Sequence, residues 1–263
     1  MIVLVLIVLG LCFGSFVNAL TWRLHERRNW VSERSECPHC HHRLAAKDLV
    51  PVFSWLSLGG KCRYCKKPIP DTPLAELLVP VLFVLSYLYW PLPLHGDGLF
   101  RFVVWLVFVI AFVTLALYDL KWYLLPDKIV FPLVYLTLAQ LLVSLFIFKQ
   151  PIHMLVGSLA GVAVISGLFA LLFYASKGQW IGFGDVKLGL VLGALAGGVQ
   201  QAVLLLFIAS VAGTLVALPM LVTGKAGRKT HVPFGPLLLF GMVIVQLWGS
   251  GIISWYTQAL LHI

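Results

Sequence analysis

The sequence predicts an all-α membrane protein of about eight transmembrane helices, with a small cysteine-bearing loop domain between the first two helices. Two observations predict the membrane class: 60% of the 263 residues are hydrophobic and only 11% are charged, and the mean hydropathy is +0.97. This composition is more apolar and less charged than that of a typical soluble protein. A third observation predicts the loop domain, because residues 21–72 form the only sizeable polar stretch and hold four of the five cysteines.

Apolar runs of about 20 residues, the length that crosses a bilayer, predict the individual spans. They lie near 2–20, 73–91, 99–119, 128–148, 153–175, 186–199, 201–222 and 235–259. The sixth run is short, because some 14 residues at about 1.5 Å each cover only about 20 Å of a roughly 30 Å hydrocarbon core. We expect this helix to begin inside a protein-lined, water-accessible depression.

The formal charge of +9 follows from membrane topology rather than from nucleic-acid binding. If the N-terminus is outside and the spans alternate, 17 of the 19 Lys and Arg residues fall inside, as the positive-inside rule expects. The first apolar run has no basic residue before it and is followed by Arg23, Arg27 and Arg28, so we predict an anchor rather than a cleaved signal. The loop at 21–72 is therefore expected in the cytoplasm.

Two Cys-x2-Cys pairs in this loop predict a structural zinc site. The pairs are separated by 21 residues, the spacing of a four-thiolate site, and their members are Cys37, Cys40, Cys62 and Cys65. Two disulfides are the alternative, but a cytoplasmic loop lies in a reducing compartment. We expect the nearby histidines to be solvated and Cys12, in the first span, to be a small apolar residue. Metal binding should supply much of the order of this loop domain.

Gly182-Phe183-Gly184-Asp185 opens the short sixth span and places a carboxylate at the head of an apolar helix. Residues 185, 189, 193 and 197 share one helix face, so Asp185 heads a stripe of glycines that another helix can approach closely. The simpler alternative is an N-cap followed by ordinary membrane packing. Asp119 ends the third span at the same predicted depth and opposes its helix dipole, whereas Asp127 is expected to be an N-cap.

Two carboxylates that meet at this depth could divide the work of an acid and a base. When they lie within about 3 to 5 Å, one holds a proton and the other does not, which is the arrangement of aspartic proteases. An ion-coupled carrier that uses Asp119 and Asp185 is the alternative, since intramembrane acids and interrupted helices also occur in carriers. A zinc-loop scaffold without chemistry would leave the pair of acids unexplained.

In order and spacing, several motifs together resemble the type IV prepilin peptidases, members of the GxGD class of intramembrane aspartic proteases. The matching motifs are Gly14 to Asn18 with Arg23, the two Cys pairs, Gly60-Lys61-Cys62, Pro70 to Glu76, Asp119 with Leu125-Pro126-Asp127, Gly182 to Lys187, and Pro233 to Pro236. The resemblance implies Asp119 and Asp185 as the catalytic pair, with Gly182, Gly184 and Lys187 in the active-site loop.

The resemblance also implies the reaction, the cofactors and the division of the chain. The enzyme would remove the basic leader of prepilins and pseudopilins at a Gly-Phe-like junction, on the cytoplasmic side of the bacterial inner membrane. Many members then methylate the new N-terminus with S-adenosylmethionine, an activity associated with the cysteine loop, for which Gly60 and Lys61 are candidates. The expected parts are the first transmembrane helix at 1–20, the zinc loop at 21–72 and the peptidase domain at 73–263.

Overall fold

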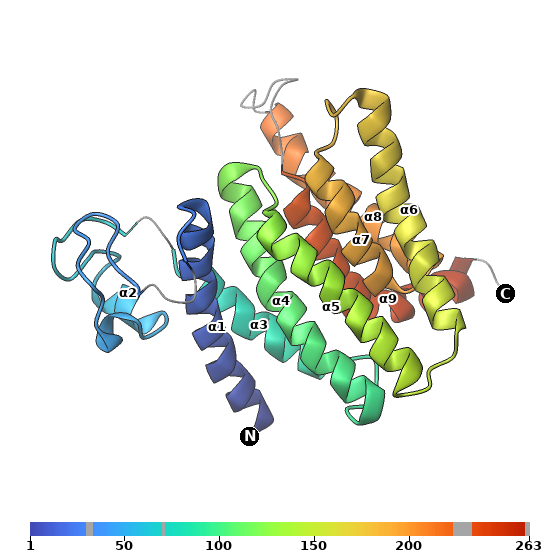
Figure 1. The fold of residues 1–263 in the computed structure, drawn as a ribbon, viewed down its shortest axis with the longest axis horizontal. Helices are drawn as coiled ribbons and strands as arrows, with labels where there is room; N and C mark the ends of the chain where they lie inside the picture. The colour runs from blue at the N-terminus through green and yellow to red at the C-terminus, as the bar shows by residue number, and fades with distance from the viewer. Residues whose placement is uncertain (30–33, 70–71, 223–232, 261–263) are drawn as a thin grey trace. The chain divides into compact units, whose positions relative to one another are not determined.

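The protein is described by a computed structural model that covers residues 1–29, 34–69, 72–222 and 233–260. Pro70 and Asp71, at the expected start of the second span, lie outside the described residues, as do Lys225, Arg228 and Lys229, which were expected on the inside. Within the described ranges the chain is almost entirely helical and has no extended strand, which confirms the predicted fold class (Figure 1).

Each predicted span corresponds to one helix. The helices are α1 Ile2–His25, α3 Leu74–Leu88, α4 Gly96–Trp122, α5 Asp127–Phe146, α6 His153–Ser176, α7 Phe183–Ala196, α8 Val199–Val222 and α9 Gly235–Leu260. Two short helices, η1 Ala46–Asp48 and α2 Phe53–Ser57, lie in the cysteine loop. Six of the helices found in the described ranges are long and apolar enough to cross a bilayer, and these are all of the eight except α3 and α7.

The helix α3 is shorter than the predicted span at 73–91. It ends at Leu88, three residues before Pro91, and a second proline follows at Pro93. Proline restricts the residue before it to extended conformations and lacks the N–H that a helix needs, so the apolar run continues without helical structure. Apolar length therefore overestimated this span. The shortness of α7, by contrast, was expected from the sequence.

The chain divides into two compact units, residues 1–88 with 105–114 and residues 89–104 with 115–263. In the first unit α1 packs against α3 through two glycines. A Cβ atom at Gly10 would lie 2.4 Å from the Cα atom of Pro80, and one at Gly14 would lie 2.5 Å from the Cα atom of Glu76. The two helices can approach this closely only because these positions lack side chains. In the same unit the indole N–H of Trp105 donates to the Ser86 hydroxyl at 2.9 Å.

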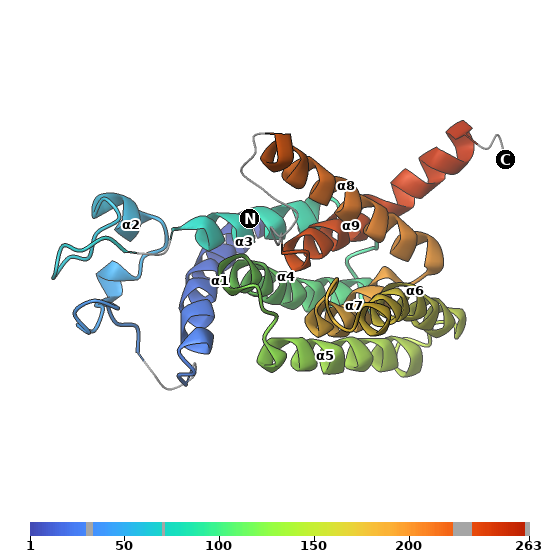
Figure 2. The same ribbon diagram turned by 90° about the horizontal axis from the view of Figure 1, so that it is seen from above.

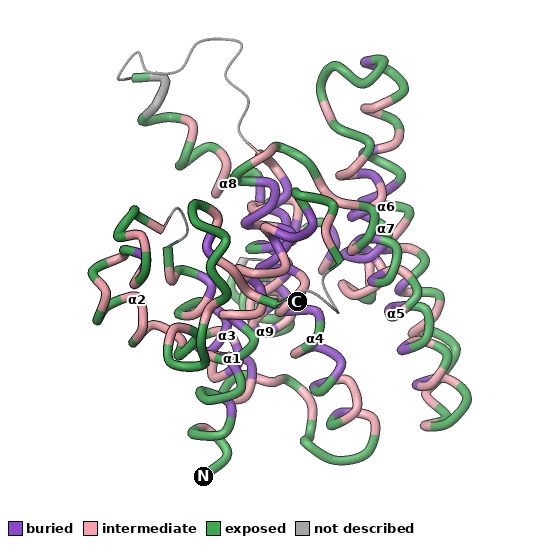
Figure 3. Tube along the Cα trace, turned by 60° about the vertical axis from the view of Figure 1, so that its left-hand side comes forward, coloured by how far each residue is buried: buried purple, intermediate pink, exposed green. Residues whose placement is uncertain are grey.

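In the second unit α5, α6 and α7 lie side by side, and α8 packs against α9 (Figures 1 and 2). The predicted glycine stripe on α7 faces α6, where a Cβ atom at Gly193 would lie 2.6 Å from the carbonyl oxygen of Gly161. The Ser166 hydroxyl of α6 also donates to the Val186 carbonyl at 2.9 Å. Buried residues recur along α7 (Figure 3), among them Leu188 and Leu192. The stripe is thus a close helix contact, as predicted.

Candidate active site and cysteine cluster

Asp119 lies in the last turn of α4 and is buried, with 6% of its surface exposed. Its carboxylate accepts a hydrogen bond from the backbone N–H of Gly235, the first residue of α9. The amino end of a helix carries partial positive charge and free N–H groups, which favour a carboxylate. The end of α9 therefore compensates Asp119 for its unfavourable place at the carboxyl end of its own helix.

Gly235 allows this contact because it has no side chain. A Cβ atom at this position would lie 2.6 Å from Oδ2 of Asp119 and 3.4 Å from Cδ2 of Leu125. Any other residue would push the carboxylate aside or move α9. The sequence motif Pro233 to Pro236 included this glycine without indicating its role, because nothing local in the sequence links it to Asp119.

Asp185 is the third residue of α7, and Gly182 is the N-cap residue of that helix. The Asp185 carboxylate accepts from the backbone N–H of Gly182, and the Asp185 N–H donates to the Gly182 carbonyl at 3.1 Å. The first of these contacts is the side-chain half of a capping box. The simple N-cap alternative for Asp185 is therefore wrong by three positions, although the residue does help to begin the helix.

The two acids lie in one neighbourhood of the second unit. Asp119 is within electrostatic range of Asp185, and Leu125 from the α4–α5 loop lies between their supporting glycines. A Cβ atom at Gly184 would lie 3.2 Å from Cβ of Leu125, which also approaches Gly235. The carboxylates thus come from α4 and α7, and the backbone around them comes from α9 and from the loop after α4.

Lys187 follows Asp185 by two residues and ties α7 to α5. Its ammonium group forms an ion pair with Asp127, and it also lies 5.5 Å from the ring centroid of Phe131 and 5.4 Å from that of Phe183. Asp127 is the first residue of α5 and Pro126 is the N-cap, so the predicted N-cap is wrong by one position. The Lys187 side chain is 17% exposed and that of Asp127 is 55% exposed.

The four loop cysteines form the predicted cluster. Their sulfur atoms all lie within 4.8 Å of one another, and Cys37 Sγ lies 3.8 Å from Cys65 Sγ. None of them forms a disulfide, so the disulfide alternative has no support. The cluster can hold a metal ion. The neighbouring histidines His39, His41 and His42 are exposed, and their side chains do not belong to the cluster, although the backbone N–H of His39 donates to the Cys37 sulfur at 3.4 Å.

The two Cys-x2-Cys segments build the cluster with the same turn. In the first, His41 N–H donates to the Cys37 carbonyl at 2.9 Å, and in the second, Lys66 N–H donates to the Cys62 carbonyl at 3.0 Å. His41 and Lys66 both adopt left-handed backbone conformations. Backbone N–H groups of Cys65 and Tyr64 also donate to the Cys62 sulfur and lower the pKa of this thiol to about 7. A thiolate is the form that binds a metal ion.

Asp48 links η1 to the second Cys-x2-Cys segment. It accepts from Nε of Arg63 at 2.6 Å, from the Tyr64 hydroxyl at 3.0 Å and from the Ala45 N–H at 3.1 Å. The bond from Arg63, aided by those from Tyr64 and Ala45, keeps the pKa of the Asp48 carboxyl below its ordinary value. The sequence did not single out Asp48, because it is one of several acids scattered through a basic loop and belongs to no motif.

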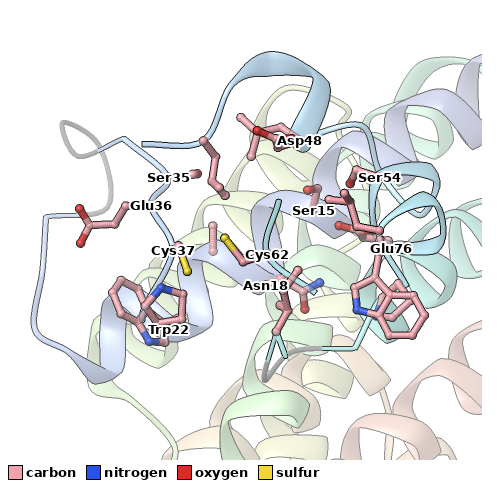
Figure 4. Close-up of a pocket in the computed structure, with 18 of the residues that line it drawn as sticks. Ser15, Asn18, Trp22, Ser35, Glu36, Cys37, Asp48, Ser54, Cys62 and Glu76 are labelled. Atoms are coloured by element: carbon pink, nitrogen blue, oxygen red, sulfur yellow. The ribbon is translucent and has the colours of Figure 1, made fainter. Parts of the chain in front are cut away.

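A cavity of about 210 Å³ lies beside the cysteine cluster within the first unit (Figure 4). We call it the loop cavity, and its lining includes Asn18, Trp22, Cys37, Trp55, Cys62 and Glu76. Of the two methylation candidates, Gly60 contacts Trp55 of this lining, whereas Lys61 is exposed and does not line the cavity. The sequence did not predict the cavity, because its walls come from α1, the loop and the start of α3.

Comparison with known proteins identifies the family. Residues 8–90 match the bacterial peptidase A24 N-terminal domain and residues 106–218 match the type IV leader peptidase family. A prepilin leader peptidase/N-methyltransferase of Stutzerimonas stutzeri is 32% identical over 97% of this chain and 94% of its own length. The chain belongs to the type IV leader peptidase family. It is therefore an enzyme and a multi-pass membrane protein.

Further relatives in other bacteria carry the same name. The proteins of Pseudomonas aeruginosa and Bacillus subtilis are 32% and 29% identical to this chain, each over 97% of it and over 93% and 97% of their own lengths. No solved structure matches the chain. The carrier alternative finds no support among these relatives.

Proposed function

We propose that this leader peptidase removes the basic leader of type IV prepilins and pseudopilins at a Gly-Phe-like junction, with Asp119 and Asp185 as its catalytic pair. The observation that supports the proposal is that the two acids, from α4 and α7, lie in one neighbourhood around Leu125, which approaches both Gly184 and Gly235. The name shared by the relatives, prepilin leader peptidase/N-methyltransferase, supports the substrate class.

The proposed hydrolysis divides acid and base work between the two carboxyl groups. The ionised aspartate takes a proton from a water molecule while the water oxygen attacks the scissile carbonyl, and the protonated aspartic acid donates its proton to the carbonyl oxygen. The tetrahedral intermediate then collapses, the carbon–nitrogen bond breaks and the leaving amine takes up a proton. Gly182 and Gly184 let an extended substrate come close to the backbone of the active-site loop.

The proposed orientation follows the positive-inside rule. The N-terminus is outside, and the cysteine loop and both aspartates lie at the cytoplasmic face of the bacterial inner membrane. A prepilin consists of a basic leader and a long apolar helix, so the helix lies in the lipid bilayer with its scissile bond at the depth of the aspartates. Lipid and prepilin are then the partners, and nucleic acid is not one of them.

The proposed second activity belongs to the loop at 21–72, and the peptidase occupies 73–263 after the first helix at 1–20. Cys37, Cys40, Cys62 and Cys65 would hold a structural Zn²⁺, the metal that favours four thiolates. S-adenosylmethionine, when bound, would supply an electrophilic methyl group to the new N-terminal amine, with S-adenosylhomocysteine as the leaving group and the displaced proton passing to solvent. Gly60 and Lys61 stay candidates for this site.

The test is cleavage of a purified prepilin with a basic leader and a Gly-Phe junction. We expect the wild type to cut it, and Asp119→Asn and Asp185→Asn each to lower the rate by at least about 10³-fold, because the pair works as a unit. Mass spectrometry of the product N-terminus, with and without S-adenosylmethionine, reads cleavage and methylation separately. Unaltered thermal unfolding is the control, and an Asn variant that still cuts at the wild-type rate would reject the catalytic pair.

A further inference from the structure

The loop cavity is a formed binding site that the peptidase chemistry does not use. Figure 4 shows side chains of α1, namely Ser15, Asn18 and Trp22, around the same hollow as Cys37 and Cys62 of the loop. These two cysteines are the buried members of the metal cluster. The cysteine cluster thus forms part of the wall of the cavity, and both lie in the first unit.

A strained backbone and a glycine place Trp55 in the wall of the cavity. Val52, the N-cap residue of α2, has a φ of +63°, an uncommon conformation for a β-branched residue. Oε2 of Glu76 accepts the Val52 N–H at 2.6 Å and holds this turn. A Cβ atom at Gly60 would lie 3.0 Å from Cζ2 of Trp55, so the ring occupies its place because residue 60 is glycine. Strain of this kind persists only where the surroundings fix it, and it is common at ligand sites.

The indole N–H of Trp55 has no hydrogen-bond acceptor among the described residues, although it is buried. Buried indole N–H groups normally have a partner, and leaving one unpaired is unfavourable. The amide of Asn18, also in the lining, makes one long hydrogen bond within the described ranges, at 3.5 Å to the Thr72 carbonyl. The cavity therefore offers donors that a bound molecule with acceptor atoms would satisfy.

The charges around the cavity favour a ligand with both signs of charge. Trp22 and Glu76 lie on opposite sides of it (Figure 4), and the guanidinium of Arg28 lies 4.9 Å from the Trp22 ring centroid. The lining holds charged groups of both signs, namely the arginines Arg23, Arg28, Arg34 and Arg63 and the acids Glu36, Asp48 and Glu76. A purely anionic phosphate ligand would meet Glu76, and an uncharged lipid chain would leave both ends unsolvated.

We propose that the loop cavity binds S-adenosylmethionine, which deepens the proposed methyl transfer and rests on it. The adenine base is a planar ring with acceptor nitrogens, which suits the indole rings and the Trp55 N–H. The sulfonium and ammonium groups are cations, which suit Glu76 and aromatic faces. The terminal carboxylate suits the arginines. Gly60 then acts as a positioning residue, through Trp55 and not through the donor itself.

Direct binding tests this site without relying on activity. Radiolabelled S-adenosylmethionine is bound to the purified full-length protein in equilibrium dialysis, and ultraviolet cross-linking followed by peptide mapping finds the labelled segment. We expect label on the peptides that contain Trp22 or Trp55. Trp55→Ala should weaken binding by about 10-fold or more and Trp55→Phe by about 3- to 10-fold, since the latter keeps the ring and loses the N–H.

Matched controls separate the cavity from general damage to the loop. Gly59 and Gly60 both have positive φ, but a Cβ atom at Gly59 would meet no atom within 4 Å. Gly60→Ala should therefore weaken binding by about 5-fold or more, whereas Gly59→Ala carries the same backbone strain and should change it by less than about 2-fold. Phe53→Ala, on α2 but 69% exposed and outside the lining, should also have little effect. Zinc content and prepilin cleavage are measured for every variant.

The outcomes distinguish failure of the site from failure of the second activity. Wild-type binding that persists in Trp55→Ala and Gly60→Ala, with zinc retained, would overturn the cavity as the donor site while leaving methyl transfer intact. A wild type that cuts prepilin but neither binds nor uses S-adenosylmethionine would overturn the methyl transfer itself. Selective loss of binding in the two variants, with normal cleavage, would establish the site.

Discussion

The cysteine loop and the aspartate pair differ in how their functional side chains come together. In the loop, two short segments use the same turn, and hydrogen bonds within each segment orient its pair of sulfur atoms. Around the aspartates no such local unit exists, and the carboxylates come from α4 and α7 while the N–H donor to Asp119 comes from α9. One site is built by spacing along the chain and the other by packing of helices.

Because the two sites are built differently, we expect them to respond differently to single substitutions. In a site made by local turns and a metal ion, loss of one ligand should weaken both metal binding and the fold of the loop, because the two are coupled. A site made by packed helices should respond to single atoms at the contact points, because reacting groups tolerate little displacement. The following variants break one region at a time, beginning with the largest expected effect.

Cys37→Ser should destabilise the cysteine loop and leave the aspartate site intact. We expect zinc affinity to fall by at least about 100-fold and methylation to be lost, while cleavage stays within a few-fold of the wild type. Metal analysis and product mass spectrometry measure the two effects, and Cys12→Ser is the control, since Cys12 lies on α1 outside the cluster. An equal loss of cleavage would mean that the loop is structural for the whole enzyme.

Gly235→Ala should lower the rate of cleavage, because it adds one methyl group beside Asp119. The new Cβ atom would lie 2.6 Å from Oδ2 of Asp119, so the carboxylate must move, and displacement by about 1 Å can lower a rate by about 100-fold. Initial rates of prepilin cleavage measure this, with methylation of a pre-cut pilin expected to be normal. Gly251→Ala is matched, because Gly251 lies on the same helix with open space around it. If both variants cut equally well, Gly235 does not position Asp119.

The ion pair between Lys187 and Asp127 should have a smaller effect. Because Asp127 is 55% exposed, we expect a coupling energy of at most about 1 kcal/mol in a double-mutant cycle of Asp127→Asn and Lys187→Gln. Lys187→Gln should slow cleavage more than Asp127→Asn, since it also removes contacts with two aromatic rings. The cycle is read from unfolding and cleavage at low and high salt, and a coupling that salt does not weaken would contradict this interpretation.

The smallest expected effect is on the pH dependence of the stability of the cysteine loop. Arg63 lowers the folded-state pKa of Asp48, so the folded loop binds protons there less readily than the unfolded chain. The stabilisation is present above the ordinary Asp value of about 4 and is lost as pH falls through the lower, folded value. Arg63→Gln should therefore destabilise the loop at neutral pH and raise the pH at which acid releases its zinc. Arg43→Gln is the control, because the exposed Arg43 has no comparable carboxylate contact among the described residues.

Features that depend on neighbours along the chain could be predicted before the structure was known. Apolar runs located the eight helices, and six of them have the length that the thickness of a bilayer requires. The Cys-x2-Cys spacing predicted the cluster, and the period of the helix placed Asp185 at the head of a glycine stripe that α6 indeed approaches. Where a predicted boundary was wrong, the cause was also local: α3 ends before Pro91, earlier than the apolar run predicted.

Tertiary structure alone decided which distant groups meet. Nothing near Asp119 in the sequence indicates that the first N–H of α9 compensates its charge, and nothing near Trp55 indicates that α1 and Glu76 complete a cavity beside it. Composition and periodicity report which face of a helix is apolar, but they do not report which helix covers that face. Helix packing brings the carboxylates to their glycines, and the turn at Val52 with Gly60 sets the indole in place.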